Sequence, residues 1–261
     1  MSPAEKVFVE SLGTYDDFDA VEQASNVITW IEKWFERNGK GCNAVIGISG
    51  GKDSTVTAAL CAKALGKDRV IGVLMPNGVQ PDIQDSYDVI NFLGIKHFVC
   101  NINEAVGAIG KSVTQYISLT DQAVTNLPAR VRMATLYAVS QSINGRVANT
   151  CNFSEDYVGY STKYGDAAGD FAPLKTFTSD EVILIGNAIG VPQRFIFKTP
   201  SDGLCGKTDE DNLGFSYAVL NRYIRTGEID DEKVKERIDY LNRVNEFKEK
   251  IIDRYVYIPK G

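Results

Sequence analysis

Between residues 19 and 150, apolar segments of strand length alternate with segments of helical period, and this alternation limits the folds open to the chain. Strands are expected over residues 43–48, 69–75, 96–100 and 146–150, and helices over 19–38, 54–65, 82–93, 103–113 and 126–143. Such an order is typical of a parallel sheet, because each strand must return through a helix before the next begins. We therefore predict an α/β fold, with a doubly wound, Rossmann-like parallel sheet flanked by helices.

The pattern loosens after Thr150. Residues 151–174 are polar and contain glycines without a clear period, and a stretch of this length in a compact domain is usually functional or disordered. Helices are expected again over 179–189 and 230–252. No linker-like composition divides the chain, so we expect a single domain over residues 1–261.

The sequence GISGGKDS, residues 47–54, directly follows the first expected strand. Gly50 and Gly51 allow backbone N–H groups to approach a ligand, and Ser49 and Ser54 add hydroxyl donors. The following helix, with Ser54 expected near its N-cap, directs its positive end at the same place. Because ligands of doubly wound sheets bind at the carboxyl ends of strands, the segment predicts a phosphate-binding loop.

This loop matches neither of two common phosphate motifs. A Walker A motif requires glycine and serine or threonine where Ile46 and Asp53 stand, and the dinucleotide pattern G-x-G-x-x-G fails after Gly47. Asp53 would repel a phosphate unless a cation lay between them, which suggests Mg²⁺. A turn with only a structural role would need neither this carboxylate nor so many donors.

Composition argues against several other classes of protein. The net charge of −6 and pI near 5.0 disfavour a broad nucleic-acid-binding surface. The sequence has no apolar run of the roughly 20 residues needed for a membrane span, and its N-terminus does not read as a signal peptide. Five cysteines without a CxxC pair, beside a single histidine, disfavour a zinc site or disulfide framework. We expect a cytoplasmic protein with reduced thiols and no nucleic-acid or membrane partner.

The segment SGGKDS resembles the SGGxDS pyrophosphate loop of the ATP pyrophosphatase superfamily, whose members cleave ATP to AMP and pyrophosphate. Three later segments are similar, in order and spacing, to motifs of the NAD synthetases: NLPARVRMATLYAVSQSINGRVANTCNFSED (126–156), GYSTKYGDAAGDFAPL (159–174) and KTPSDGLCGKTDEDNLGFSY (198–217). The resemblance covers nearly the whole chain and implies an adenine nucleotide alpha-hydrolase-like fold. The length suits the ammonia-using form, with a synthetase domain and no glutaminase domain.

The resemblance implies that deamido-NAD, ATP and ammonia react to give NAD, AMP and pyrophosphate. The nicotinate carboxylate would attack the α-phosphorus of ATP to form an adenylate, and ammonia would then displace AMP. Catalysis would consist mainly of alignment and of neutralising phosphate charge. Members of the family build the deamido-NAD site across a two-fold interface, so a homodimer is also implied.

The family positions that bind ATP correspond here to the loop and to three later residues. The loop supplies Gly47, Ile48, Ser49, Gly50, Gly51, Lys52, Asp53 and Ser54. The later residues are Thr150, Ser179 and Ser201. Asp53 and Glu155 match the carboxylates that bind Mg²⁺, which polarises phosphate oxygens. The implied co-substrate and cofactor are therefore ATP and Mg²⁺.

The positions that hold deamido-NAD are matched by Arg130, Lys163 and Asp170. Asp166 matches a residue near the ammonia position, where it would hold ammonia or take its proton. The resemblance thus assigns catalysis to Asp53, Glu155, Lys163 and Asp166. Solvated helix charge remains an alternative for Arg130, a helix N-terminal charge for Glu155, and turn capping for both Asp166 and Asp170.

Two aromatic side chains align with those that flank the nicotinate ring, Phe35 and Tyr160. Phe35 also lies on the apolar stripe of the helix over 19–38, so core and site both remain open for it.

The chain departs from the family pattern at three sites, one of which is Asn77, where a tyrosine is common. Ser179 stands where a lysine usually contacts ATP phosphate, and either Lys175 or Lys163 supplies that charge or ATP binds more weakly. Phe247-Lys248 replaces a His-Lys pair that reaches deamido-NAD across the dimer. Lys248 can keep this role, whereas Phe247 cannot donate a hydrogen bond.

Two rival functions remain. Another superfamily enzyme, tRNA-modifying or sulfur-transferring, would need catalytic cysteines, and Cys151 and Cys205 lie in loops. A non-catalytic nucleotide sensor would be compatible with the changes at Ser179 and Phe247.

Overall fold

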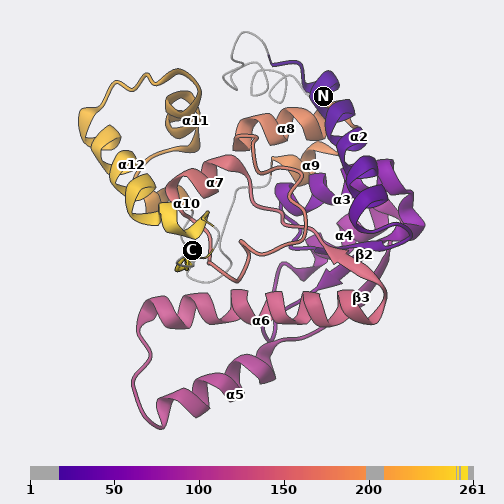
Figure 1. Ribbon diagram of the computed structural model, residues 1–261, viewed down its shortest axis with the longest axis horizontal. Coiled ribbons are helices and arrows are strands. Elements are labelled where there is room, and N and C mark those ends of the chain that lie inside the picture. The colour runs from indigo at the N-terminus through magenta and orange to yellow at the C-terminus, as the bar shows by residue number, and fades with distance from the viewer. Residues whose placement is uncertain (1–17, 198–208, 251, 253, 258–261) are drawn as a thin grey trace.

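Four parallel strands form a sheet in the part of the chain that the computed structural model describes, residues 18–197, 209–250, 252 and 254–257 (Figure 1). They are β1 (Asn43–Gly47), β2 (Val70–Leu74), β3 (Lys96–Val99) and β4 (Gly145–Val147), in the spatial order β3-β2-β1-β4. The chain thus builds outward from β1 through β2 to β3 and then returns to place β4 on the other side of β1. The predicted doubly wound α/β fold is confirmed, and the strand order reverses between β1 and β4.

Alternate residues of the central strands face two different apolar layers. Val45, Ile71 and Val73 pack against α6 (Asp121–Ser142), through side chains that include Leu136 and Val139. Ile46 and Leu74, among others, point to the opposite face. That face is covered by α2 (Ala20–Asn38), α3 (Lys52–Leu65), α4 (Ile83–Leu93), α8 (Ser179–Ala188) and α9 (Gln193–Ile196). The continuous apolar sequence of β1 follows from this burial on both faces.

A second, smaller apolar cluster lies apart from the sheet. It is enclosed by α7 (Phe153–Val158), α10 (Asp209–Leu213), α11 (Tyr217–Thr226) and α12 (Glu232–Asn245). Its buried side chains are Val158, Leu213, Phe215, Tyr217, Leu220 and Ile238. Because α7 begins just after β4 while α10–α12 come near the C-terminus, this cluster brings the late part of the chain beside the carboxyl end of the sheet (Figure 1).

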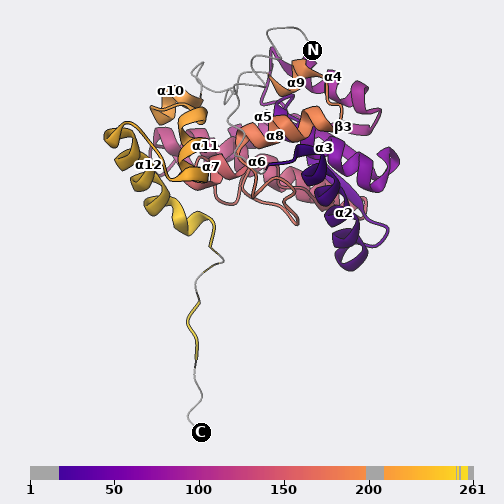
Figure 2. The same cartoon turned by 90° about the horizontal axis from the view of Figure 1, so that it is seen from above.

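The helix α5 (Asn103–Thr114) lies beside α6, at the edge of the molecule (Figure 1). All residues of α5 are described, and none is buried. Beyond α12, residues 254–257 run away from the body (Figure 2). Short 3-10 turns occupy Lys67–Arg69 and Glu246–Lys248. Within the described ranges, no helix combines the length and apolar character that crossing a membrane requires.

Several predicted boundaries were wrong. The helix α3 begins at Lys52 with Gly51 as N-cap, so Ser54 lies inside the first turn. The helix α6 begins at Asp121 rather than 126, because the Thr120 side chain caps it by accepting the N–H of Ala123. The last helix ends at Asn245 and not near residue 252.

Among the described residues, four α-helices were not predicted, namely α7, α9, α10 and α11. The helix α7 lies in the stretch expected to lack periodicity, and a capping box between Asn152 and Glu155 stabilises its start. The helix α11 was missed as well. The fourth strand was expected over 146–150, but β4 covers only Gly145–Val147. Ala148 forms an isolated parallel bridge with Phe171 instead.

Candidate active site

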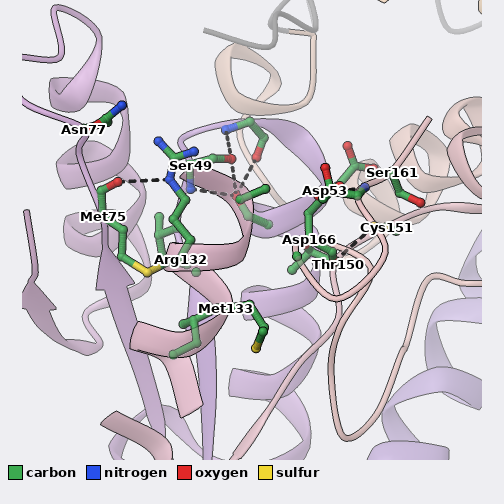
Figure 3. A pocket seen from close by; sticks show the side chains of 18 of the residues that line it. Ser49, Asp53, Met75, Asn77, Arg132, Met133, Thr150, Cys151, Ser161 and Asp166 are labelled. Atoms are coloured by element: carbon green, nitrogen blue, oxygen red, sulfur yellow. Dashed lines mark hydrogen bonds between the residues drawn. The ribbon is translucent and has the colours of Figure 1, made fainter. Parts of the chain in front are cut away.

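A pocket of about 800 Å³ opens at the carboxyl ends of β1 and β4, where the strand order reverses. This is the position at which open α/β sheets bind ligands. Its walls come from the loop after β1, the loop between β2 and α4, one face of α6, and the segment between β4 and α8. Asp53, Thr150, Cys151, Ser161 and Asp166 gather on one side, while Met75, Arg132 and Met133 lie on the other (Figure 3).

The loop after β1 is held in shape by its own hydrogen bonds. The Gly51 N–H donates to Ser49 Oγ over 3.2 Å, and the Ser49 N–H donates to Ser54 Oγ over 3.3 Å. Gly50 has φ +80, and a Cβ there would lie 2.8 Å from the Cβ of Asp85. Only glycine fits this position, because the left-handed backbone and the close approach of α4 both exclude a side chain. The loop is therefore shaped before a ligand binds.

Two carboxylates from distant parts of the sequence meet at this loop. Asp53, in the first turn of α3, accepts at Oδ1 from Asn152 Nδ2 over 3.1 Å. The backbone N–H of Asn152 donates to Oε2 of Glu155 over 3.3 Å. Asn152 thus contacts both Asp53 and Glu155 and fixes α7 against α3.

The electrostatics of this pair suit a cation. Burial raises the pKa of Glu155 well above its usual value, and the negative charge of Asp53 raises it further. Carboxylate oxygens are the ligands that Mg²⁺ prefers, and Mg²⁺ usually takes only one or two from protein beside phosphate and water. In the described ranges no group of three or more His, Cys, Asp or Glu side chains is arranged to hold a metal. Asp53 and Glu155 therefore fit a magnesium ion that brings phosphate and water as its other ligands.

Asp166 and Lys248 line the pocket beyond the carboxylate pair. Asp166 Oδ1 accepts the backbone N–H of Thr162 over 3.0 Å, and burial raises the pKa of this aspartate. Lys248 Nζ donates to the carbonyl oxygens of Gly159 and Ser161 over 2.6 and 3.0 Å. Burial lowers the pKa of Lys248, against the opposing charge of Asp166. An acid and an amine thus lie at the same end of the pocket.

Arg132 is a pocket residue that the sequence assignments missed. Its Nε donates to the carbonyl oxygen of Met75 over 3.1 Å, and burial lowers the pKa of its guanidinium. Helical spacing could have identified it, since Ala129, Arg132, Met133 and Leu136 follow the spacing of one helix face and all line the pocket.

The structure brings many of the predicted site residues together at the pocket. Those among its lining are Gly47, Ile48, Ser49, Gly51, Asp53, Ser54, Thr150, Glu155, Tyr160, Asp166 and Lys248. Gly50 and Lys52 belong to the same loop without lining the pocket themselves. Ser201 lies outside the described residues.

Three predicted residues are placed elsewhere, in hydrogen-bonded or apolar surroundings. Ser179 is buried at the start of α8 and accepts from Asn221 Nδ2 over 3.2 Å. Asp170 accepts the backbone N–H of Val147 over 2.7 Å and so fixes the end of β4. Phe35 is 2% exposed and packs edge-on against Phe171, which places it in the core.

The remaining predicted residues lie beside the pocket and contact one another. Arg130 Nε donates to the carbonyl oxygen of Lys163 over 3.3 Å. Lys163 Nζ in turn donates to the carbonyl oxygen of Phe247 over 2.6 Å, and it lies over the Phe247 ring. Lys175, which was considered as a replacement for the family lysine, pairs with Asp156 and Glu249 instead.

Sequence comparison agrees with the motif resemblance. The family described as NAD synthase matches residues 23–256. The chain is 42% identical over 199 residues to the NH(3)-dependent NAD(+) synthetase of Pyrococcus furiosus, covering 76% of each chain. It is 39% identical over 239 residues to the protein of that name from Methanocaldococcus jannaschii, covering 87% of this chain and 90% of the relative.

Solved structures agree as well. The NMN synthetase from Francisella tularensis superposes with a TM-score of 0.84 and 32% identity, covering 92% of this chain and 100% of that chain. The NH3-dependent NAD synthetase from Campylobacter jejuni superposes with a TM-score of 0.76 and 25% identity, with the same coverage of 92% and 100%.

Proposed function

This chain belongs to the NAD synthase family, and we propose that it catalyses the ATP-dependent amidation of deamido-NAD with ammonia. The products are NAD, AMP and pyrophosphate. One observation supports the proposal most directly. The pocket at the strand reversal combines a glycine loop for a triphosphate, a carboxylate pair suited to a divalent cation, and an acid and an amine, Asp166 and Lys248, on its wall.

Each part of the pocket has a task in this reaction. Backbone N–H groups and hydroxyls of residues 47–54 bind the triphosphate, and the apolar wall of Met75, Met133 and Leu136 accepts the adenosine. Asp53 and Glu155 would hold Mg²⁺, which neutralises phosphate charge when bound. The chain itself aligns the nicotinate carboxylate with the α-phosphorus and keeps water away from the adenylate.

Asp166, Lys248 and Tyr160 serve the second half of the reaction. We assign to Asp166 the tasks of holding ammonia and of taking its proton as the amide forms. Desolvation raises the pKa of Asp166, and a raised pKa strengthens the carboxylate as a base because it increases its affinity for a proton. Lys248 and Tyr160 would contact the nicotinate part of deamido-NAD from their places on the pocket wall.

The direct test measures NAD formation from deamido-NAD, ATP and ammonium by the purified protein. Asp53→Asn keeps the shape of the side chain and removes its charge, so we expect kcat to fall by roughly a hundredfold or more. Asp68→Asn makes the same change at an exposed aspartate just after α3, so it is the matched control and should retain activity. Normal turnover by Asp53→Asn, or no NAD from the unaltered protein, would refute the assignment.

The similarity to an NMN synthetase favours a second candidate substrate, the acid mononucleotide. The adenylation and amidation steps would be the same, because both acids carry the nicotinate carboxylate. Competition between deamido-NAD and nicotinate mononucleotide in the same assay distinguishes the two. A higher kcat/KM for the mononucleotide would replace the substrate proposed above.

Sulfur transfer is less compatible with the pocket. Cys151 lines it, but burial raises the pKa of this thiol well above its usual value, and the charge of Glu155 adds to the effect. A thiol that resists ionisation is a poor nucleophile. Cys205 lies outside the described residues.

We also propose that the enzyme is a homodimer through α5 and α6. These helices and the segment between them leave apolar side chains exposed: Ile109 (43%), Tyr116 (85%), Ile117 (65%) and Val124 (56%). A second copy of the chain would cover them. Sedimentation at micromolar concentration should show a dimer, and the double variant Tyr116→Asp/Ile117→Asp should sediment as a folded monomer. A monomeric parent protein with full activity would contradict this.

We propose a cytoplasmic location, because the reaction consumes ATP. The thiols of Cys42, Cys61, Cys100 and Cys151 are free in the structure, as expected in a reducing compartment. Cell fractionation with an antibody against the chain would test this location.

A further inference from the structure

Lys52 is the most deeply buried cation near the pocket among the described residues. It stands at the variable position of the loop sequence SGGKDS, and its side chain is only 6% exposed. A lysine at the start of an exposed helix would normally extend into water. Here the side chain turns inward, away from solvent, and its surroundings explain why.

The ammonium group of Lys52 lies among acids from three elements. It pairs with Asp53 Oδ2 over 2.8 Å, while the other oxygen of that carboxylate is held by Asn152. Burial alone would lower the pKa of Lys52, but the charges of Asp53, Glu155 and Asp209 outweigh this and raise it. The ion pair with Asp53 thus holds a positive charge inside the protein.

An aromatic ring completes this environment. Lys52 Nζ lies 5.9 Å from the centre of the Tyr217 ring, and the Tyr217 hydroxyl donates to Asp209 Oδ2 over 3.4 Å. The second apolar cluster thus contributes to the surroundings of Lys52 through α10 and α11. The ammonium is a fixed part of the fold and is not a solvated end of a flexible chain.

We propose that Lys52 is an internal counter-ion that takes the electrostatic place of the divalent cation at Asp53 and Glu155 in the nucleotide-free protein. Cation binding then requires the ammonium to leave Asp53, and the polyphosphate of ATP provides its new partner. Lys52 is thus a positioning residue that makes uptake of the cation depend on the nucleotide. The identities of nucleotide and cation rest on the proposed function.

The physical basis is competition between like charges. An ammonium at hydrogen-bond distance from Asp53 repels a second cation at the same carboxylate, and burial strengthens the repulsion. The negative charges of a bound triphosphate remove this competition, because the Lys52 ammonium and the divalent cation then each have an anionic partner. Cation and nucleotide should therefore bind cooperatively, and the coupling should be reciprocal.

The first test measures Mn²⁺ binding to the nucleotide-free protein by electron paramagnetic resonance. Lys52→Met keeps the length of the side chain and removes its charge, so Mn²⁺ should bind roughly tenfold or more tightly than to the parent protein. Lys52→Arg keeps the charge and should bind Mn²⁺ as the parent does. The double variant Lys52→Met/Asp53→Asn should not show the tighter Mn²⁺ binding of Lys52→Met, which would assign the tighter binding to the Asp53 carboxylate.

A second test measures the coupling with the α,β-methylene analogue of ATP, which cannot be cleaved at the reacting bond. By calorimetry, Mn²⁺ should tighten analogue binding by a larger factor in the parent than in Lys52→Met. Lys52→Gln provides a second neutral variant should the methionine variant fail to fold. A role in folding alone would not tighten Mn²⁺ binding.

Mn²⁺ binding to either neutral variant that is no tighter than to the parent would overturn the proposal. These measurements do not require turnover, so they separate this inference from the proposed function. If Mn²⁺ binds as expected but no NAD forms, the proposed role of Lys52 is supported and the proposed reaction is refuted. If NAD forms but the neutral variants bind Mn²⁺ no more tightly than the parent, the reaction is supported and the counter-ion role of Lys52 is refuted.

Discussion

Asp156 adjoins Glu155 on α7, yet its side chain lies in a different environment. Its Oδ2 accepts from Lys175 Nζ over 2.8 Å, and Lys175 also pairs with Glu249. Its Oδ1 is buried without a hydrogen-bond partner in the described part of the chain. A single lysine therefore balances two acids, and the buried one remains incompletely solvated.

This environment makes stability depend on pH. Burial raises the pKa of Asp156 from 3.8 to about 6, against the opposing effect of Lys175. The folded state thus holds the proton more tightly than the unfolded chain. The stabilising contribution is present in full below pH 3.8 and is lost as the pH rises through about 6. At neutral pH the loss amounts to about 3 kcal/mol.

Asp156→Asn should remove this dependence. As the pH rises from about 4.5 to about 7.5, the parent loses the contribution of the Asp156 proton and the variant does not. The free energy of unfolding of the variant should therefore increase by roughly 2 kcal/mol relative to that of the parent. Urea unfolding at several pH values measures it, with exposed Asp68→Asn as control. A difference between variant and parent that stays constant with pH would show that Asp156 ionises normally.

At the scale of an element, α7 decides whether the two proposed metal ligands meet. It is a short helix that depends on its capping box, in which Asn152 accepts the N–H of Glu155 over 3.1 Å. The same asparagine donates to Asp53. One residue thus starts the helix and aligns its first turn with α3.

Asn152→Ala should affect stability and activity together. We expect a loss of about 1 kcal/mol from the missing cap, and a further fall of kcat because Asp53 and Glu155 lose their common partner. The matched control is Asp19→Ala, which removes the cap of α2 far along the chain from the pocket. Thermal unfolding should show similar losses in the two variants, whereas only Asn152→Ala should lose NAD formation. Equal activity in both would separate α7 from catalysis.

At the scale of the whole molecule, two apolar clusters stabilise different sets of helices. The large cluster joins the sheet to α2, α3, α4, α8 and α9, and the small one holds α10–α12 against α7. Residues of the small cluster approach the pocket through Tyr217 and Asp209. We therefore predict that the α10–α12 region opens while the sheet and its loops stay folded.

Substitutions in the two clusters should separate these parts. Ile238→Ala removes a fully buried side chain from the small cluster at a cost of about 2–5 kcal/mol. Hydrogen exchange should then increase in α10–α12 while β1 and β2 remain protected. Ile185→Ala, in the large cluster, should reduce protection throughout the chain. Matching exchange patterns in both variants would mean that the molecule opens as one unit.

Much of the fold and of the phosphate loop could be predicted from the sequence. The strands β1 and β2 were located because apolar runs bounded by polar residues record burial locally, and the order of strands and helices implied a parallel sheet. The loop was located because two glycines, two hydroxyls and an acid after a strand have few structural uses. The resemblance to NAD synthetases then identified Asp53 and Glu155, which the fold brings to one pocket.

Other features were decided only by the tertiary structure. Arg130 and Arg132 read alike in sequence, yet only Arg132 lines the pocket, because the rotation of α6 against the sheet selects the face that points inward. Phe35 could have served core or site, and its packing against Phe171 placed it in the core. The inward turn of Lys52 depends on acids from α3, α7 and α10. Local pattern determines which elements form, whereas side-chain environments depend on contacts between segments that are distant in the sequence.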